Sequence, residues 1–474
     1  MSRPIYLAFA IMLLGAVLHG VESPAQAAEE PVAEGQGLFL IITDIHFNPF
    51  ADPNLATALA SAPVAQWQSI LSGSIQTGFA QYGSDSNFPL MQSALGAAQT
   101  VSDSRGVPYD FVLYPGDYIA RNFYGDFGRY IGGGEQALQA FVIKTMQFVS
   151  AMLEQTFQVP VYGTIGNRDA ICGNYMIAPD SAMLPAVGAT WGVLADRPAA
   201  LESFSIGGSY ALPHPVVPDH TLIVLNSVFW STRYANRCGQ HDVDPGAAQM
   251  AWLEWQLYKA RLSGQDVSLM MHIPPGIDAH QSATSGTCHG NVTPFWHEVY
   301  AERFLALTRS YRDILRNSFA GHTHMDDFRV IADDEGAPYL LTRITPAVSP
   351  VFGNNPAFTT VRYDRTSGDL LDYATYYLTN LASAGKGEEA KWSLEYEFGG
   401  AYGFGAYDPA NLQTLAEQIQ SDEAVRAKYR AFYAAETSAE PPITDRNWGI
   451  YACAQTALTV KSFEACYCKD GQPK

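Results

Sequence analysis

Seven residues of metal-ligating type stand in short polar clusters along the chain. They are Asp44, His46, Asp117, Asn167, His272, His322 and His324. Carboxylate, amide and imidazole groups of this kind bind Zn²⁺, Mn²⁺ or Fe. Each residue alone also fits an ordinary role, as a helix cap, a turn residue or a buried histidine. Taken together, they predict a metal site.

The last two of these residues, His322 and His324, are separated by a single residue. Side chains at this spacing point to the same side of an extended segment. In an extended segment, His322 and His324 would therefore face the same side, as ligands of one centre should.

The polar clusters follow short apolar runs, which are typical of buried strands. These runs cover residues 38–42, 111–114, 159–165, 222–225, 267–271 and 318–320. Segments with helical spacing, at 136–155 and 249–262, lie between them and predict an α/β fold. Ligands of such folds bind beyond the carboxyl ends of the strands, where the polar clusters stand.

The pattern changes after Asp327. Residues 328–331, 339–344, 359–363 and 370–378 are rich in β-forming residues, and we expect them to complete a second sheet packed on the first. Helical patterns follow from about residue 385, most clearly as one helix over 412–435. We therefore expect a catalytic domain over 35–384 and a small, mainly helical, cysteine-containing subdomain over 385–474.

The N-terminus has the features of a secretory signal. The basic residue Arg3 precedes an apolar run over 5–18, and small residues at 25–27 provide a cleavage site. The run is shorter than the about 20 residues that span a membrane. We expect a signal peptide over 1–27, a secreted or periplasmic protein and no stable membrane anchor. An uncleaved N-terminal anchor is the alternative.

The composition narrows the class of partner. The 474 residues include 28 Lys and Arg against 47 Asp and Glu, which gives a net charge of −19. Such an acidic chain lacks the cations that neutralise the phosphates of a duplex, which argues against bulk nucleic acid as a partner. With 47% hydrophobic and 16% charged residues, the chain is also too apolar for a disordered protein.

The order of the ligand motifs resembles that of a known superfamily. Asp-x-His, Gly-Asp, Gly-Asn, a single His and Gly-His-x-His follow one another as in the calcineurin-like metallophosphoesterases. The resemblance implies a two-sheet β-sandwich flanked by helices, with two divalent metal ions at the strand ends. It also implies that a hydroxide bridging the two ions attacks the phosphorus.

The same resemblance implies how the ligands divide. They form two triads, which are Asp44, His46 and His324 for one metal, and Asn167, His272 and His322 for the other. Asp117 would bridge the two ions. Zinc is the metal that we expect, with manganese and iron as alternatives.

Further motifs narrow the resemblance to the acid sphingomyelinase-like phosphodiesterases. They lie in the segment 244–254, the loop 272–276, the segment 345–358 and the cysteine-containing tail. The six cysteines all follow the predicted signal, and an even number in an exported protein indicates disulfides. The number alone leaves their pairing open. The branch implies two disulfides, Cys238–Cys288 and Cys453–Cys466, and leaves Cys172 and Cys468 unassigned.

Two arginines depart from the family pattern. Position 168 is Arg where the family has His after Gly-Asn, and Arg121 replaces a His four residues after the bridging Asp117. Arginine keeps its proton at neutral pH, so it is a poor general acid but a good ligand for phosphate oxygens. We therefore expect Arg121, Arg168 and Asp117 to be the catalytic residues, in a site that favours leaving groups departing without a proton. Alternatively, the arginines turn outward or pair with Asp169 or Asp126.

These observations predict an exported two-metal phosphodiesterase that hydrolyses a phosphodiester or nucleotide-type phosphate. Its substrate would be a small phosphodiester, a phospholipid or a nucleotide. Two alternatives stay open because arginines replace the usual histidines. One is a phosphomonoesterase on the same scaffold, and the other is a catalytically weak member that binds phosphate ligands.

Overall fold

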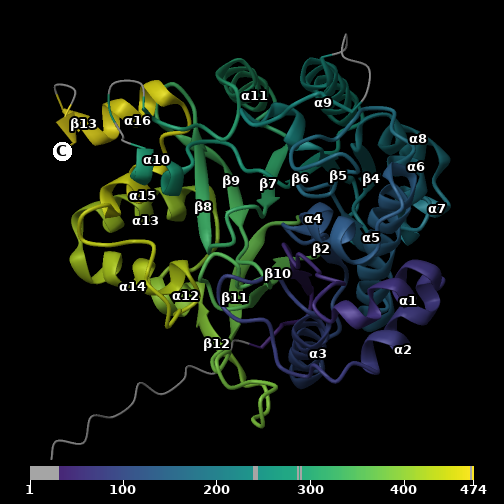
Figure 1. Cartoon of the computed structure of the whole chain (residues 1–474). Coiled ribbons are helices and arrows are strands. Elements are labelled where there is room, and N and C mark those ends of the chain that lie inside the picture. The colour runs from purple at the N-terminus through teal and green to yellow at the C-terminus, as the bar shows by residue number, and fades with distance from the viewer. Residues whose placement is uncertain (1–30, 239–243, 286–287, 289–290, 470–471, 474) are drawn as a thin grey trace, which may run out of the picture. The chain divides into compact units, whose positions relative to one another are not determined.

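The computed structural model of the protein describes residues 31–238, 244–285, 288, 291–469, 472 and 473 (Figure 1). The chain from Pro31 onward forms one compact unit. The predicted signal peptide, residues 1–27, lies outside the described residues.

The first of two six-stranded sheets mixes parallel and antiparallel pairs. Its strands are, in spatial order, β12 (Trp392–Glu397), β11 (Leu370–Leu378), β10 (Ala357–Asp364), β1 (Gln36–Ile41), β2 (Val112–Tyr114) and β3 (Val161–Gly163). β1 pairs with β2, and β2 with β3, in parallel. Because the three strands are parallel, their carboxyl ends share one edge of the sheet.

The second sheet is parallel in its centre. Its strands are, in spatial order, β4 (Tyr210–Pro213), β5 (His220–Leu225), β6 (Asp266–Met271), β7 (Leu315–Ala320), β9 (Pro338–Ile344) and β8 (Asp327–Ala332). β5, β6, β7 and β9 are parallel, and the two outer strands run antiparallel to their neighbours. The carboxyl ends of β6 and β7 therefore also meet at one edge.

The inner faces of the two sheets pack against each other. The ring of Phe39 in β1 lies 5.6 Å from that of Phe319 in β7, in an edge-to-face arrangement. Beside the sheet ends, Thr164 Oγ1 donates to the carbonyl oxygen of Leu225 at 2.9 Å. The predicted α/β fold with two packed sheets is thus confirmed.

The later strands are shared between the sheets. β8 and β9 join the second sheet as expected, but β10 and β11 join the first, where β10 pairs antiparallel with β1. The prediction that all four complete the second sheet is therefore wrong. Alternation along a strand shows which side is buried but not which distant strand becomes its neighbour.

Helices cover the outer faces of the sheets (Figure 1). Before β8 they are α1 (Ala56–Ser61), α2 (Trp67–Ser72), α3 (Phe88–Arg105), α4 (Phe123–Tyr130), α5 (Glu135–Phe157), α6 (Met183–Gly188), α7 (Gly192–Ala195), α8 (Pro198–Gly207), α9 (Pro245–Leu262), α10 (Ala279–Ser285) and α11 (Glu298–Ser310). α5 and α9 confirm the two predicted helices. α9 begins where the Asp244 side chain accepts a hydrogen bond from Ala247 N at 3.0 Å, with Pro245 in its first turn.

The C-terminal region is mainly helical, as expected. It contains α12 (Phe398–Tyr402), α13 (Pro409–Ser421), α14 (Glu423–Tyr433), α15 (Trp448–Ala454) and α16 (Val460–Tyr467), followed by the short β13 (Cys468–Lys469) and β14 (Gln472–Pro473). The predicted single helix over 412–435 is in fact two helices, because Asp422 has extended backbone and caps α14 through Ala424 N. β12 follows residue 385 yet pairs with β11. The exact domain boundary at 384/385 stays a prediction.

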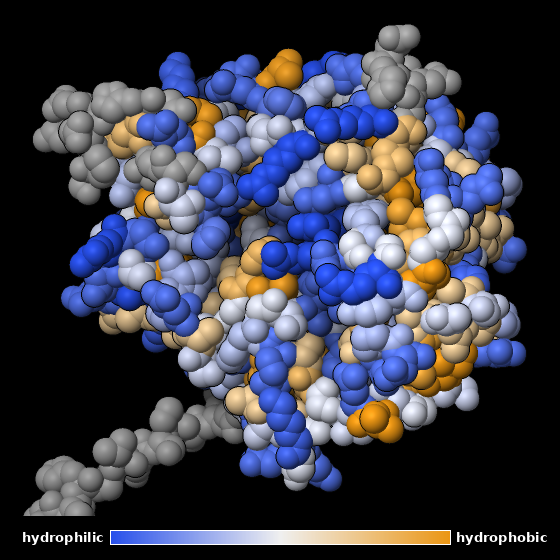
Figure 2. All heavy atoms as spheres, viewed as in Figure 1, coloured by the Kyte–Doolittle hydropathy of each residue, from blue (hydrophilic) through white to orange (hydrophobic). Residues whose placement is uncertain are grey.

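No helix among the described residues combines the length and the apolar composition needed to cross a bilayer. On the face shown in Figure 2, hydrophilic residues predominate and hydrophobic ones form small separate patches.

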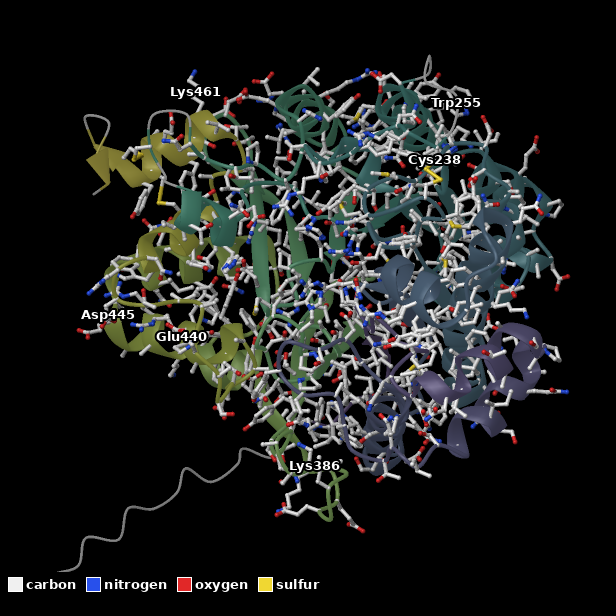
Figure 3. The ribbon with its side chains drawn as sticks, viewed as in Figure 1. Cys238, Trp255, Lys386, Glu440, Asp445 and Lys461 are labelled. Atoms are coloured by element: carbon white, nitrogen blue, oxygen red, sulfur yellow. A yellow bond between two sulfur atoms is a disulfide. The ribbon has the colours of Figure 1, made fainter. Side chains whose placement is uncertain are left out.

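Three disulfides join the six cysteines. Cys172 pairs with Cys238 (Figure 3), Cys288 with Cys468, and Cys453 with Cys466. The expected Cys453–Cys466 bond is confirmed and the expected Cys238–Cys288 bond is wrong. Cys172 and Cys468, which had no expected partner, are bonded to Cys238 and Cys288, respectively. The Cα atoms of each pair lie 6.1 Å apart.

The contact between the two sheets gives a testable expectation for stability. Phe319 is 3% exposed, so Phe319→Ala leaves a cavity and lowers the free energy of unfolding by about 3–5 kcal/mol, measured by urea unfolding. Phe352→Ala makes the same chemical change at a ring that is 52% exposed, and we expect a change within about 0.5 kcal/mol. Equal losses in the two variants would contradict the packing described here.

Candidate metal centre and substrate pocket

The structure brings all seven predicted residues together at the carboxyl ends of parallel strands. The residues follow β1, β2, β3, β6 and β7 directly. Six of them are buried, with exposures of 4% or less, and His322 is partly buried. Two sheets thus contribute donors to one site because both direct their parallel strand ends toward it.

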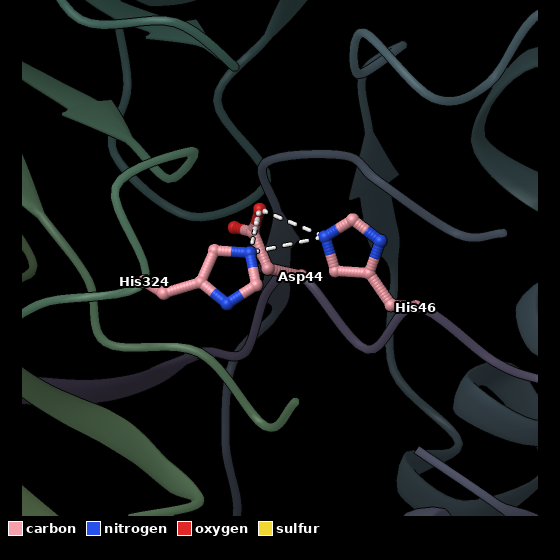
Figure 4. A group of neighbouring side chains, drawn as sticks. All are labelled: Asp44, His46 and His324. Carbon is pink, nitrogen blue, oxygen red and sulfur yellow. Dashed lines mark hydrogen bonds and ion pairs between the residues drawn. The ribbon is translucent and has the colours of Figure 1, made fainter. Parts of the chain in front are cut away.

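One half of the site consists of Asp44, His46 and His324 (Figure 4). The Nε2 atoms of the two histidines face each other at 3.0 Å. Asp44 Oδ1 lies 3.7 Å from His46 Nε2 and 3.5 Å from His324 Nε2. The other carboxylate oxygen, Oδ2, accepts hydrogen bonds from Thr43 Oγ1 at 2.7 Å and from His322 N at 3.0 Å, which fixes the direction of Oδ1.

The other half consists of Asn167, His272 and His322. His272 Nε2 lies 3.0 Å from Asn167 Oδ1 and 3.2 Å from His322 Nδ1. The amide nitrogen of Asn167 donates to Asn174 Oδ1 at 2.7 Å. The amide is thereby oriented with its oxygen toward His272.

Asp117 lies between the two halves. Its Oδ2 is 3.3 Å from His46 Nε2 and 3.4 Å from His272 Nε2. Its Oδ1 accepts a hydrogen bond from Arg168 N at 2.8 Å. One oxygen of Asp117 therefore faces both halves while the other is held by the backbone.

The three turns that carry most of these donors have left-handed backbone. The φ angles are 49° at Asp44, 47° at His46, 57° at Asp117, 72° at His322 and 67° at His324. Non-glycine residues rarely adopt this region, and such strain concentrates at functional sites. The backbone at His322 and His324 is therefore not extended, and each of the two imidazoles faces a different half of the site.

Backbone carbonyls hold three of the imidazoles. The Nδ1 atoms of His46, His272 and His324 lie 3.0, 2.8 and 3.4 Å from the carbonyl oxygens of Ile119, Pro115 and Ser349. A proton on Nδ1 satisfies each carbonyl and leaves Nε2 with a free lone pair toward the site. This is the usual way in which a protein orients a histidine for a metal.

Asp169 supports the turn that carries Asp117. This fully buried carboxylate accepts hydrogen bonds from the backbone N–H groups of Asp117, Tyr118, Ile119 and Gly166, at 2.7–3.3 Å. Burial and the neighbouring charge of Asp117 raise the pKa of Asp169 to about 7. Its partners are backbone groups of the site, so its role is to position Asp117.

Neighbouring charges and burial raise the pKa of two of the four imidazoles and lower that of the other two. Burial opposes the charge of His46 and His272, but Asp117 and Asp44 raise the pKa of both to about 9. Against the effect of burial, His272 and His46 hold the pKa of Asp117 well below its usual range. Without a metal ion, the two carboxylates therefore favour a second proton on each of these imidazoles, on the Nε2 atom that otherwise offers its lone pair to the site.

The other two imidazoles behave oppositely. Burial and the neighbouring His272 lower the pKa of His322 to about 3, and burial with the charge of His46 does the same for His324. Each half of the site thus has one protonated and one neutral imidazole whose nitrogens face each other.

The donor set fits divalent cations. Asp44 Oδ1 is a buried oxygen without a hydrogen-bond partner among the described residues, which is costly unless a cation or water satisfies it. Ligand atoms of Asp44, His46 and His324 lie within 4.8 Å of one another, as do those of Asp44, Asp117 and His272. Two converging groups of oxygen and nitrogen donors are what a pair of Zn²⁺-type ions requires.

The donors open into a pocket of about 360 Å³. Arg121 and Arg168 line it beside His46, Asp117 and Asn167. Arg168 Nη1 donates to the carbonyl oxygen of Arg121 at 3.1 Å. The partners of Asp169 are backbone groups, so the alternative pairing of an arginine with that carboxylate does not occur among the described contacts.

The comparisons with known proteins agree with this geometry. Residues 339–471 match the family model described as the acid sphingomyelin phosphodiesterase C-terminal region. The acid sphingomyelinase-like phosphodiesterase 3b of Homo sapiens is 26% identical over 454 residues, covering 92% of this chain and 91% of the relative. The chain is thus similar to acid sphingomyelinase-like phosphodiesterases over most of its length.

Two further matches are a relative and a solved structure. This protein is 27% identical to the cyclic GMP-AMP phosphodiesterase SMPDL3A of Rattus norvegicus. The alignment covers 76% of this chain and 81% of the relative. Among solved structures, a dimetal phosphatase from Danio rerio aligns at a TM-score of 0.42 and 15% identity, covering 73% of this chain and 96% of that one.

Sequence patterns did not indicate several of the residues that line the pocket. Phe352, Tyr433 and Tyr451 line the pocket, and the last two come from the helical C-terminal region. Aromatic residues are common in cores, so their type alone carries no signal for a site. Asp169 is the one positioning residue that could have been found, because it closes the Gly-Asn-x-Asp motif.

The variant Asp169→Asn tests whether the Asp169 carboxylate holds the turn that carries Asp117. The amide nitrogen accepts no hydrogen bond, so two of the four backbone N–H groups lose their acceptor. We expect the free energy of unfolding to fall by about 2–4 kcal/mol in urea titrations.

Asp445→Asn is the matched control for this change. The Asp445 side chain is 92% exposed (Figure 3), so the expected change lies within about 0.5 kcal/mol. An Asp169→Asn variant as stable as this control would show that the carboxylate does not hold the turn.

Proposed function

We propose that the chain is an exported two-metal phosphodiesterase that hydrolyses a small phosphodiester or nucleotide-type phosphate. The observation that carries this proposal is the pair of donor groups that meet at Asp117 on the floor of a pocket. Relatives of similar length carry names of phosphodiesterases, one of them for cyclic GMP-AMP. The pocket volume of about 360 Å³ lies in the range of small-molecule sites.

We assign the ligands according to their proximity. Asp44, His46 and His324 would hold one metal ion, and Asn167, His272 and His322 would hold the other. Asp117 would serve both ions, because its Oδ2 lies at similar distances from a histidine of each half. Zinc suits the mixture of imidazole and carboxylate donors, with manganese or iron as alternatives.

A pair of divalent ions supplies a nucleophile from water at neutral pH and neutralises charge on the phosphoryl oxygens. The residues of the chain have to orient the substrate against this centre. Arg121 and Arg168 line the pocket next to the donors, and their planar guanidinium groups match phosphate oxygens. They bind the phosphate and stabilise the charge that develops on it.

The same arginines set the choice of leaving group. A guanidinium stays protonated over the working range of pH and gives up no proton to a departing oxygen. The site therefore favours leaving groups that are stable as anions, such as a nucleotide phosphate or nitrophenolate, over the alkoxide of a ceramide.

Two alternatives belong to the same site. A grip of two arginines also suits the terminal phosphate of a monoester, which makes a phosphomonoesterase the second candidate. The third is a protein that binds phosphate ligands with little turnover, because the histidines expected to act as acids are replaced.

Metal analysis with two substrates separates the three functions. We expect about two zinc ions per chain by plasma mass spectrometry, and His324→Ala to lower this number toward one. The zinc-loaded protein should turn over bis-p-nitrophenyl phosphate faster than p-nitrophenyl phosphate and lose the activity in EDTA. A reversed preference would support the monoesterase, and no turnover of either ester would support the binding protein.

Arg168→His tests the effect on the leaving group. A histidine at this position can donate a proton, and general acids contribute about 10²–10⁴-fold to rates. We expect kcat/KM for phenyl methyl phosphate to rise at least about tenfold relative to p-nitrophenyl methyl phosphate. Because the acid must be protonated, this gain should fade as the pH rises through the pKa of the new histidine.

Arg303→His is the control for this prediction. Its guanidinium is 47% exposed and pairs with Glu254 away from the pocket-lining residues. The ratio of the two rates should stay as in the parent. If Arg168→His also leaves the ratio unchanged, then Arg168 does not face the leaving group.

A further inference from the structure

Phe352 is an exposed aromatic residue beside the metal centre. It is 52% exposed and lines the pocket. Its ring lies 4.6 Å from the ring of His324, and the guanidinium carbon of Arg121 stands 4.9 Å from its centroid. An apolar ring with more than half of its surface open thus stands within reach of a phosphate bound by Arg121.

The loop that carries this ring is fixed at both ends. Ser349 N donates to the carbonyl oxygen of Asp44 at 3.1 Å, and Asn355 N donates to that of Ala434 at 3.2 Å. Inside the loop, the Asn354 amide donates to the carbonyl oxygen of Ser349 at 3.0 Å. The backbone holds the ring in place before a ligand arrives, which lowers the entropic cost of binding on it.

The other phenylalanine and tyrosine side chains that line the pocket are buried. Tyr175, Phe295, Tyr433 and Tyr451 line it with exposures of 5, 7, 4 and 1%. Tyr175 and Phe295 pack against His322 with ring centroids 6.3 and 5.5 Å away. Among the phenylalanine and tyrosine residues that line the pocket, Phe352 therefore offers the most open ring, and the exposed imidazole of His280 is the other open aromatic group there.

We propose that Phe352 is a stacking platform for a planar heterocyclic base, so that the pocket selects nucleotide-type phosphoesters. The proposal rests on the proposed function, which places the phosphate at the metal ions and Arg121. A base joined to that phosphate through a pentose reaches the ring. Aromatic rings stack on nucleobases of every kind, so the platform selects a base without choosing which one.

Two ligands that share everything but the base test the proposal. AMP and ribose 5-phosphate both carry the pentose and the phosphate, and the ratio of their dissociation constants isolates the base. We measure both by isothermal titration calorimetry on the zinc-loaded protein. Phe352→Ala should raise the dissociation constant of AMP about tenfold relative to that of ribose 5-phosphate.

Three further variants identify the kind of contact. Phe352→Trp should retain the preference for AMP, whereas Phe352→Leu should lose it as the alanine variant does, because an aliphatic side chain has no ring to stack. Trp255→Ala is the control, since Trp255 is 55% exposed in α9, outside the pocket-lining residues (Figure 3). It should leave both dissociation constants unchanged.

Three results would overturn the proposal. The first is a parent protein that binds AMP no better than ribose 5-phosphate. The second is a Phe352→Ala variant that binds both ligands more weakly by the same factor. The third is a Phe352→Leu variant that keeps the preference for AMP. Turnover of bis-p-nitrophenyl phosphate by the same preparation separates this test from the proposed function. Turnover without base discrimination overturns the platform alone, and base discrimination without turnover overturns the phosphodiesterase alone.

Discussion

The structure depends on the burial of two carboxylates and three imidazoles, with a fourth imidazole partly buried, within a few ångströms of one another. Asp44 and Asp117 are almost fully removed from water, and Asp44 Oδ1 lacks a hydrogen-bond partner among the described residues. Charges buried in this way need a counter-charge at close range. The raised pKa values of His46 and His272 favour protons as this counter-charge in the metal-free protein, and a pair of divalent cations would supply it when bound. The left-handed turns at the strand ends are tolerated because they direct these donors to one point.

The donors were predictable from sequence because each directly follows an apolar run that forms a strand. Their position in the chain is thereby tied to a sheet edge, and both sheets were predicted. Contacts between segments that are distant in sequence were not predictable. Such contacts place β10 and β11 in the first sheet and pair Cys238 with Cys172. The division of one expected helix into α13 and α14 was also not predicted. The pocket wall from the C-terminal region was missed for the same reason.

The net charge of −19 repels anions at a distance, but the charge of the site is set locally. Two acidic residues of that count point at the metal centre, and Arg121 and Arg168 line the pocket above them. With cations bound, this patch would be positive within an acidic surface. Phe352 then adds an apolar contact at the edge of the charged area. The combination suits a small ligand that has a phosphate at one end and a ring at the other.

Anomalous diffraction from a crystal of the zinc-loaded protein tests the central claim most directly. The account predicts two zinc peaks, one among Asp44, His46 and His324 and one among Asn167, His272 and His322. Asp117 Oδ2 should lie within bonding distance of both. A single peak, or two peaks without contact to Asp117, would contradict a two-metal centre organised around that carboxylate.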